Sequence, residues 1–207
     1  MSNIEFYIID TETNGLRAAF HEITEICCIR VSDRVHLARN IVANHPERSD
    51  ARALEVTGKT KSDLARGVSQ ENAISVFEEF ISQDGKSPKF RCVIAHQANF
   101  DMKFIHALWA QHNKSFPIDM WVDTVPMCRK WVEMQGLPKQ SVKLALASEM
   151  LGAKVVQGVH NAVSDTQNLY FVWKKLIESG VDYLDFIKLQ PHTIGQEEPD
   201  LLNSDID

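Results

Sequence analysis

The order of strand-like and helix-like segments constrains the fold of this chain more than any other feature. The first part of the chain carries three short runs rich in β-branched and aromatic residues, which predict strands: Ile4–Asp10, Glu22–Val31 and Arg34–Ala43. The turn-forming pair Asn14-Gly15 follows the first run, and the polar pair Ser32-Asp33 separates the other two. Consecutive strands with short connections pair antiparallel, so we predict a three-stranded meander at the start of the fold.

Helical segments then alternate with single strands. The apolar run Phe90–Ala95 predicts a fourth strand, and Met120–Asp123 fits either a fifth short strand or an extended loop. Apolar spacing and capping residues predict five helices: Ser49–Glu55, Ser69–Ile81, Asn99–His112, Ser141–Leu151 and Ala162–Ile177. This order predicts an α/β fold, with a mixed five-stranded sheet and helices on both of its faces.

Composition sets the size of the fold and excludes some protein classes. The chain has 207 residues, of which 44% are hydrophobic, so it can bury a core and is not disordered throughout. We predict one domain over residues 1–180 and an acidic tail over residues 181–207, partly disordered or docked as an arm. No apolar run is long enough for a transmembrane helix, and the N-terminus lacks the features of a secretory signal. We therefore expect an intracellular, cytoplasmic protein.

The charge balance limits how the chain can meet nucleic acid. Lys and Arg number 22 and Asp and Glu number 28, which gives a net charge of −6. A protein that coats long tracts of nucleic acid usually has the opposite sign, whereas an enzyme whose acidic groups surround metal ions is compatible with this balance. The four cysteines form no CxxC pair, and we expect buried free thiols.

Two carboxylates follow the first predicted strand. Asp10 and Glu12 are two residues apart, so in an extended chain they project from the same face. Two like charges at the end of a buried strand are costly unless a cation holds them, and carboxylate oxygens favour Mg²⁺ or Mn²⁺ over zinc. The alternative interpretation is structural, because an Asp after a strand is commonly a turn former or a helix cap.

Two further acidic residues open predicted helices. Asp101 follows the strand that ends near His96, and Asp165 lies about one turn into the last long helix, after His160. Either aspartate could be a first-turn acid that the helix dipole stabilises, and either histidine could be structural or a surface residue. An unpaired aspartate on the apolar side of the last helix would be hard to bury, which favours a functional interpretation for Asp165.

The ordered combination of these residues resembles the three exonuclease motifs of the DEDDh family of 3′–5′ exonucleases. The motifs are Asp10-x-Glu12, His96-x-Ala-x-Phe-Asp101 and His160-x-x-x-x-Asp165, and the resemblance spans about Ile4 to Lys175. Three intervening segments also occur in the family's order: Leu54–Gly58, Val122–Thr124, and Leu144–Ala147 leading to Leu151-Gly152.

The resemblance implies a ribonuclease H-like fold and a metal-dependent 3′–5′ exonuclease that releases nucleoside 5′-monophosphates. It implies that two Mg²⁺ or Mn²⁺ ions are held by four carboxylates: Asp10, Glu12, Asp101 and Asp165. We expect Asp101 to act through water, and the resemblance assigns His160 as the general base.

The resemblance also implies how the 3′ end is held. Backbone amides of the turn at Thr13 and Asn14 would bind the terminal nucleotide, Leu16 would wedge between the last bases, and His96 would contact the backbone near the scissile bond. Two positions depart from the family pattern: Gln97 replaces the usual Asn, and Asn14-Gly15 replaces the usual Thr-Gly. Both lie near the substrate rather than the metal ligands, so they leave the substrate class open.

Several alternatives follow for function and partners. Single-stranded DNA is the first substrate expected, and an RNA-trimming exoribonuclease is the nearest alternative. A non-catalytic nucleic-acid or protein-binding module on the same fold ranks low because no acidic residue of the motifs is missing. A plain α/β domain with chance carboxylates, such as a phosphatase-like hydrolase, is disfavoured by three motifs in order. A homodimer and a polymerase partner are both left open.

Overall fold

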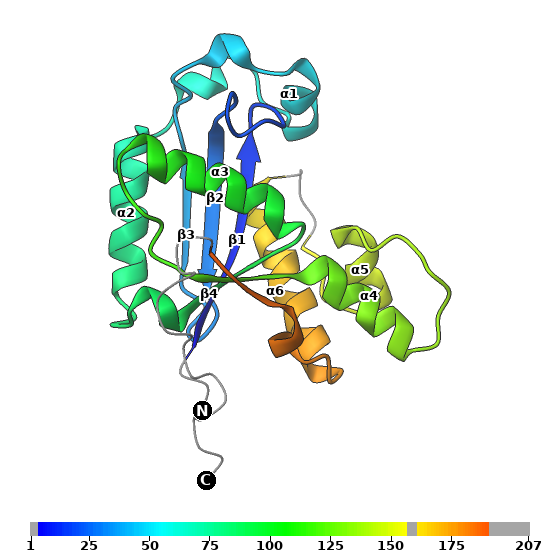
Figure 1. Cartoon of the computed structure of the whole chain (residues 1–207). Helices are drawn as coiled ribbons and strands as arrows, with labels where there is room; N and C mark the ends of the chain where they lie inside the picture. The colour runs from blue at the N-terminus through cyan, green and yellow to red at the C-terminus, as the bar shows by residue number, and fades with distance from the viewer. Residues whose placement is uncertain (1–3, 157–160, 191–207) are drawn as a thin grey trace.

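The computed structural model describes residues 4–156 and 161–190 of the chain and is built on one six-stranded sheet. The strands lie in the order β3-β2-β1-β4-β5-β6 (Figure 1). Their bounds are β1 Glu5–Thr13, β2 Ile23–Arg30, β3 His36–Asn40, β4 Arg91–Ala95, β5 Met120–Asp123 and β6 Ile187–Leu189. The first three strands form the predicted antiparallel meander, whereas β1, β4 and β5 pair in parallel, so the sheet is mixed as expected.

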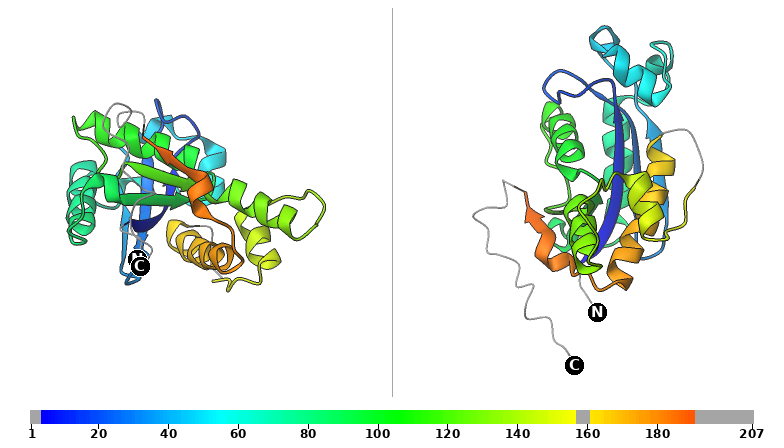
Figure 2. Two further views of the ribbon diagram at one scale, coloured as in Figure 1. Left: turned by 60° about the horizontal axis from the view of Figure 1, so that its bottom comes forward. Right: turned by 90° about the vertical axis from the view of Figure 1, so that its right-hand side faces the viewer.

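Helices cover both faces of this sheet. The helices are α1 Ala51–Thr57, α2 Gln70–Ser82, α3 Ala98–Gln111, α4 Thr124–Met134, α5 Leu144–Met150 and α6 Ala162–Glu178. The view on the left of Figure 2 shows α3 and α6 on opposite sides of the sheet. Successive residues of β1 alternate between these sides: Tyr7 and Ile9 belong to the core under α2 and α3, and Ile8 belongs to the core under α4, α5 and α6. The sequence of β1 therefore serves two hydrophobic cores at once.

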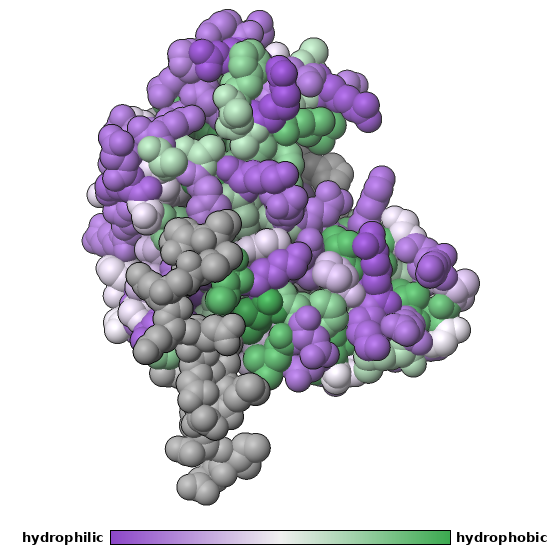
Figure 3. Space-filling view, in the orientation of Figure 1, coloured by the Kyte–Doolittle hydropathy of each residue, from purple (hydrophilic) through white to green (hydrophobic). Residues whose placement is uncertain are grey.

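Polar and charged residues dominate the face seen in Figure 3. Hydrophobic side chains also reach the surface, with Met134, Leu137 and Leu146 exposed around α4 and α5.

All four cysteines are buried and free, as predicted. No helix within the described residues has the length and apolar character needed to cross a bilayer.

The five-stranded sheet predicted from sequence is one strand short. The sixth strand, β6, runs antiparallel to β5 at the edge of the sheet, where Met120 pairs with Leu189. It lies in the segment expected to be a tail. The three residues of β6 are half-buried or exposed, and three residues are too few to show a clear alternation of apolar and polar side chains. The sequence signal for this edge strand is therefore weak. The domain boundary at residue 180 stays a prediction, since the described residues continue beyond it.

The helix α4 is absent from the sequence prediction. It starts directly after β5, where the Asp123 side chain caps it by accepting a hydrogen bond from the Val125 amide at 2.9 Å. Pro126 lies in the first turn, a position where the missing N–H of proline costs no helical hydrogen bond. A short helix that contains a proline has a weak periodic pattern, which explains the omission.

Candidate active site

Three carboxylates meet between β1 and α6. Atoms of Asp10, Glu12 and Asp165 lie within 4.8 Å of one another, and all three side chains are half-buried. Asp10 and Glu12 lie within β1, which continues to Thr13, rather than at its end as expected from the sequence. Their spacing of two residues puts both side chains on the face of the sheet that α6 covers.

The start of α6 brings the third carboxylate to this place. Asn161 is the N-cap of α6, and its side-chain oxygen accepts a hydrogen bond from the Ser164 amide at 2.8 Å. Asp165 therefore falls in the first turn of the helix. The structure thus brings together three of the four acidic residues that the sequence singled out.

The fourth acidic residue, Asp101, approaches from the other face of the sheet. It lies in the first turn of α3, is 4% exposed, and accepts two hydrogen bonds from Thr11, from the amide at 3.0 Å and from the hydroxyl at 2.8 Å. Thr11 lies between Asp10 and Glu12 in β1. Asp101 is therefore anchored beside the three-carboxylate cluster without belonging to it.

Burial and mutual repulsion dominate the electrostatics of these groups. Burial raises the pKa of Asp10 well above its usual value, and the negative charges of Asp101, Glu12 and Asp165 raise it further. Burial also raises the pKa of Asp101 to about 7, although the hydrogen bonds from Thr11 favour its charged form. Such a group of carboxylates either takes up protons or binds a cation.

The donor set fits a hard divalent cation. Asp10, Glu12 and Asp165 offer carboxylate oxygens close together, and oxygen ligands suit Mg²⁺ and Mn²⁺. A cation bound between these carboxylates would relieve the mutual repulsion that raises the pKa of Asp10. His160, the residue expected to act as general base, lies outside the described residues.

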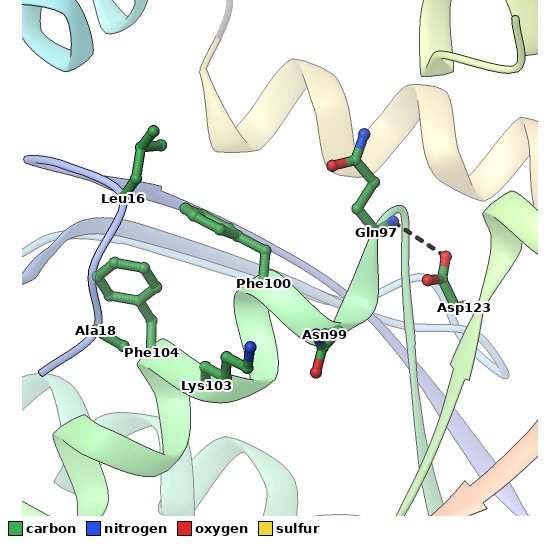
Figure 4. A pocket seen from close by; sticks show the side chains of 8 residues that line it. All are labelled: Leu16, Ala18, Gln97, Asn99, Phe100, Lys103, Phe104 and Asp123. Carbon is green, nitrogen blue, oxygen red and sulfur yellow. Dashed lines mark hydrogen bonds between the residues drawn. The ribbon is translucent and has the colours of Figure 1, made fainter.

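Two pockets meet beside the cluster at Leu16 and Phe100, which line both of them. The first pocket has a volume of about 240 Å³ and includes Glu12, Arg52 and Val56 in its lining. The second has a volume of about 290 Å³, and Figure 4 shows its lining from the loop after β1 and from α3. Leu16 is 73% exposed. Leu16 and Phe100 therefore form a partly apolar partition between two cavities.

Thr13 and Asn14 use their side chains to shape the turn that carries Leu16. The Asn14 side chain is fully buried and accepts a hydrogen bond from the Glu22 amide at 2.7 Å. The Thr13 hydroxyl donates to the Gly15 carbonyl oxygen at 2.7 Å. A Cβ atom on Gly15 would lie 2.3 Å from the His21 ring, so this position accepts only glycine without rearrangement. A substrate role for Thr13 and Asn14 would have to come from their backbone.

His96 is held inside the protein. Its Nδ1 lies 2.8 Å from the Thr124 hydroxyl and its Nε2 lies 2.9 Å from the Val142 carbonyl oxygen. Burial lowers the pKa of His96, which keeps the ring neutral near pH 7. This arrangement favours the structural alternative for His96, and its contact with substrate stays a prediction. The neighbouring Gln97 has a φ of 68°, a left-handed conformation that Asn adopts more readily than Gln.

The whole of this arrangement falls inside one known family. The RNase T family model, described as an exonuclease, matches residues 7–172, which include most of β1, all of α3 and most of α6. The chain belongs to the RNase T exonuclease family. The fold is accordingly the ribonuclease H-like exonuclease fold, and the family's chemistry is hydrolysis of phosphodiester bonds.

Curated relatives of this RNase T domain include much longer proteins. The chain is 27% identical over 180 residues to a DNA polymerase III of the PolC type from Thermotoga petrophila. That match covers 85% of this chain and 12% of the relative. The domain thus spans about an eighth of the length of the PolC-type relatives that it matches.

Solved structures share the fold of the RNase T domain at low sequence identity. The nuclease domain of 3′hExo, a DEDDh family member bound to rAMP, matches with a TM-score of 0.68 and 14% identity. The match covers 90% of this chain and 96% of that structure. The zinc-bound complex of Escherichia coli ExoI with single-stranded DNA matches with a TM-score of 0.66 and 15% identity, over 86% of this chain and 41% of that structure.

The structure adds pocket residues of the RNase T domain that the sequence did not single out. Phe100, which the sequence places between His96 and Asp101 in the second motif, is half-buried and lines both pockets. Arg52 and Val56, on α1, line the pocket that contains Glu12. The position of Phe100 directly before Asp101 is the one sequence signal that could have drawn attention to it.

Proposed function

We propose that this chain is a metal-dependent 3′–5′ exonuclease that removes nucleoside 5′-monophosphates from the 3′ end of nucleic acid. The observation that carries the proposal is the cluster of Asp10, Glu12 and Asp165 beside a pocket of about 240 Å³. Family membership supports the reaction class, and the cluster supports its dependence on metal.

The ligands in this proposal are the four acidic residues of the motifs. Asp10, Glu12 and Asp165 would hold two Mg²⁺ or Mn²⁺ ions, with Asp101 acting through water from the α3 side. Four carboxylates carry −4 and two divalent ions carry +4, so the site is near neutral before an anionic substrate arrives. When bound, the two ions stabilise the charge on the attacking and the leaving oxygen of the phosphodiester.

The pockets supply the positioning of the 3′ end in this proposal. The terminal nucleotide occupies the pocket that includes Glu12, and the preceding base occupies the pocket lined by Lys103 and Phe104. Leu16 and Phe100 separate the two bases. The buried Asn14 fixes the turn on which Leu16 is carried, and Thr13 presents its backbone to the terminal nucleotide.

His160 is the general base in this proposal. Imidazole has an unperturbed pKa of about 6.5, which suits removal of a proton from water near neutral pH. His160 lies two residues before the start of α6 and five residues before Asp165, which puts it close to the cluster along the chain.

Single-stranded DNA is the substrate that we propose first. The PolC-type relatives are DNA polymerases, and the ExoI structure holds single-stranded DNA. RNA is the second candidate because the 3′hExo nuclease domain was bound to rAMP. Whether the domain works alone, as a homodimer or with a polymerase is a separate question.

The test is a cleavage assay with three substrates labelled at the 5′ end: single-stranded DNA, duplex DNA and RNA of the same sequence. We expect a ladder that shortens from the 3′ end in Mg²⁺, no reaction in EDTA, and the fastest reaction on single-stranded DNA. Asp10→Asn should abolish the ladder, and Asp63→Asn, at an aspartate outside the cluster whose side chain is 38% exposed, should leave it unchanged. Internal fragments, or an equal ladder from Asp10→Asn, would contradict the proposal.

A further inference from the structure

A third pocket lies away from the carboxylate cluster, on the face of the sheet that α6 covers. Its volume is about 290 Å³, and it lies between the β2–β3 hairpin, the residues that follow α5, and the middle of α6. Its lining includes Arg34, His36, Lys154, Gln167, Tyr170 and Phe171. None of its lining residues lines either of the pockets beside Leu16.

The charge of this pocket is opposite to that of the chain. Arg34, His36 and Lys154 supply basic groups, and no acidic side chain occurs in the lining, although the chain carries a net charge of −6. The carboxylate of the adjacent Asp33 forms an ion pair with Arg30, in which Nη2 and Oδ2 are 2.7 Å apart. Its negative charge is therefore compensated by another residue rather than by the basic groups of the pocket.

Two of the basic side chains are available to a ligand. Within residues 4–156 and 161–190, the side chains of Arg34 and His36 have no hydrogen-bond or ion-pair partner, and both residues are exposed. Lys154 instead lies over the ring of Phe171, with its Nζ 5.5 Å from the ring centroid. The pocket thus combines free cationic groups with an aromatic wall.

The backbone at Arg34 is a second, independent observation. Arg34 has a φ of 63° in the tight connection between β2 and β3, where its amide donates to the Arg30 carbonyl oxygen at 2.9 Å. Gly, Asn and Asp adopt this left-handed conformation more readily than an arginine does. The hairpin loop therefore fixes this conformation, and it places Arg34 at the edge of the basic pocket.

We propose that this pocket binds one phosphorylated nucleotide unit. The phosphate would lie against Arg34, His36 and Lys154, since guanidinium and ammonium groups form strong charge-assisted hydrogen bonds with phosphate oxygens. The base would lie against the half-buried side chains of Tyr170 and Phe171, whose rings meet edge to face with centroids 5.5 Å apart. A cavity of about 290 Å³ is near the lower end of ligand pockets and suits a single nucleotide.

The unit has two possible sources with the same chemistry. It is either a free nucleoside monophosphate or one nucleotide of a strand whose 3′ end lies elsewhere. The proposal does not require the chain to cleave nucleic acid, so a failure of the proposed function leaves it intact.

The experiment measures binding by isothermal titration calorimetry in EDTA, with the full chain. The probes are dAMP, deoxyadenosine, inorganic phosphate, and a single-stranded octanucleotide that ends in a 3′-phosphate. We expect dAMP or the octanucleotide to bind more tightly than deoxyadenosine or phosphate alone. Binding of dAMP identifies a free nucleotide as the source, and binding of the octanucleotide alone identifies a strand.

The double variant Arg34→Ala/Lys154→Ala should weaken this binding by about tenfold or more, because it removes two charge-assisted contacts. The matched control is Arg66→Ala/Lys130→Ala, which removes the same charge from exposed side chains that pair with Asp63 and Glu133 outside the pocket. Equal affinity in the two double variants would overturn the proposal, as would the absence of binding by both dAMP and the octanucleotide. Neither double variant changes a residue of the carboxylate cluster or of the two pockets beside Leu16, so a difference between them reports on this pocket alone.

Discussion

Burial disfavours the charged form of both Asp10 and Asp84, yet their other neighbours shift the pKa values of the two aspartates in opposite directions. Asp84 has a side chain that is 2% exposed and lies 2.6 Å from the Arg91 guanidinium, and it also accepts a hydrogen bond from the Tyr7 hydroxyl. Burial opposes the charged form of Asp84, but the hydrogen bonds from Arg91, Tyr7 and the Lys86 amide outweigh it, so its pKa is lowered. Asp10 has carboxylates as its charged neighbours, and its pKa is raised.

A structural carboxylate differs from a functional one in whether the chain itself supplies the groups that balance its charge. The charge of Asp84 is balanced by the chain itself, so this aspartate joins β4 to the end of α2 without outside help. No cationic group is among those that shift the pKa of Asp10, so its negative charge is relieved either by a proton or by a cation from solution. We expect substitutions at the two positions to separate activity from stability.

The largest effect is expected at Asp10. Asp10→Asn should lower the turnover number by about 10³-fold or more, since the metal ions contribute several kcal/mol to transition-state stabilisation. The same change should not lower the free energy of unfolding in EDTA, because it relieves repulsion among carboxylates. Steady-state kinetics and urea unfolding check the two parts. A loss of stability as large as the one expected at Asp84 would erase the distinction between the two aspartates.

The next largest effect is expected at His160. His160→Ala should lower the turnover number by about 10²–10⁴-fold, the usual contribution of a general base. Mg²⁺ affinity, measured by calorimetry, should stay near that of the unchanged chain, whereas Asp10→Asn should lose it. Equal loss of metal affinity in the two variants would contradict this division of roles.

Asp84→Ala should act on stability instead. Removing one partner of a buried ion pair leaves the Arg91 guanidinium without its counter-charge, and the free energy of unfolding should fall by about 3 kcal/mol. The turnover number should change little at a temperature where the variant is folded. Kinetics at 15 °C, with circular dichroism to confirm folding, make this measurement. A catalytic defect in the folded Asp84→Ala variant would count against a purely structural role.

Opposite pH dependences of stability should follow from the two environments. The pKa of Asp101 is raised to about 7, so its contribution to stability is present below about pH 4, the unfolded value, and is lost as the pH rises to 7. Asp10 acts in the same direction. The lowered pKa of Asp84 gives the reverse, a contribution that is present above about pH 4 and lost as the pH falls below it.

Thermal unfolding in EDTA should therefore give a higher melting temperature at pH 5 than at pH 8. Addition of Mg²⁺ should raise the melting temperature more at pH 8, where the carboxylates are charged, than at pH 5. The Asp10→Asn variant should show a smaller response to Mg²⁺ at pH 8. A response to Mg²⁺ that is equal at both pH values would contradict the electrostatic account of the cluster.

The smallest effect is expected at Leu16. Leu16→Ala should raise the KM for single-stranded DNA by about tenfold, since burial of a leucine side chain against the bases is worth about 1.5–3 kcal/mol. It should change stability little because the side chain is 73% exposed. Val35→Ala, at an exposed apolar residue that lines neither pocket beside Leu16, is the matched control. An unchanged KM would remove Leu16 from the proposed partition.

Sequence reasoning predicted five of the six strands and the pairing of Asp10 with Glu12 because their signals are local. Ile8 and Asp10 belong to one short run, and period-two alternation alone places Asp10 and Glu12 on one face. The position of Asp165 beside them depends on how α6 crosses the sheet, which no local pattern encodes, so it required the resemblance to a family. The strand β6 and the helix α4 were missed because both are short and weakly patterned.

The sequence does not predict the parts of the site that depend on hydrogen-bond partners far away along the chain. Nothing around His96 reveals that Thr124 and Val142 occupy both of its ring nitrogens, since these partners are 28 and 46 residues away. The burial of the Asn14 side chain against Glu22 is likewise a tertiary fact. Polar residues near a motif are therefore easily assigned to substrate when their partners lie within the fold.

The position of Thr11 has a consequence for any attempt to rebuild this centre. Its neighbours in β1 point to one side of the sheet, while its own amide and hydroxyl hold Asp101 on the other. The acidic groups are therefore assembled through the thickness of the sheet rather than on one surface of it. A scaffold into which they were grafted would need helices above and below a single strand, and a simple strand–helix pair would not suffice.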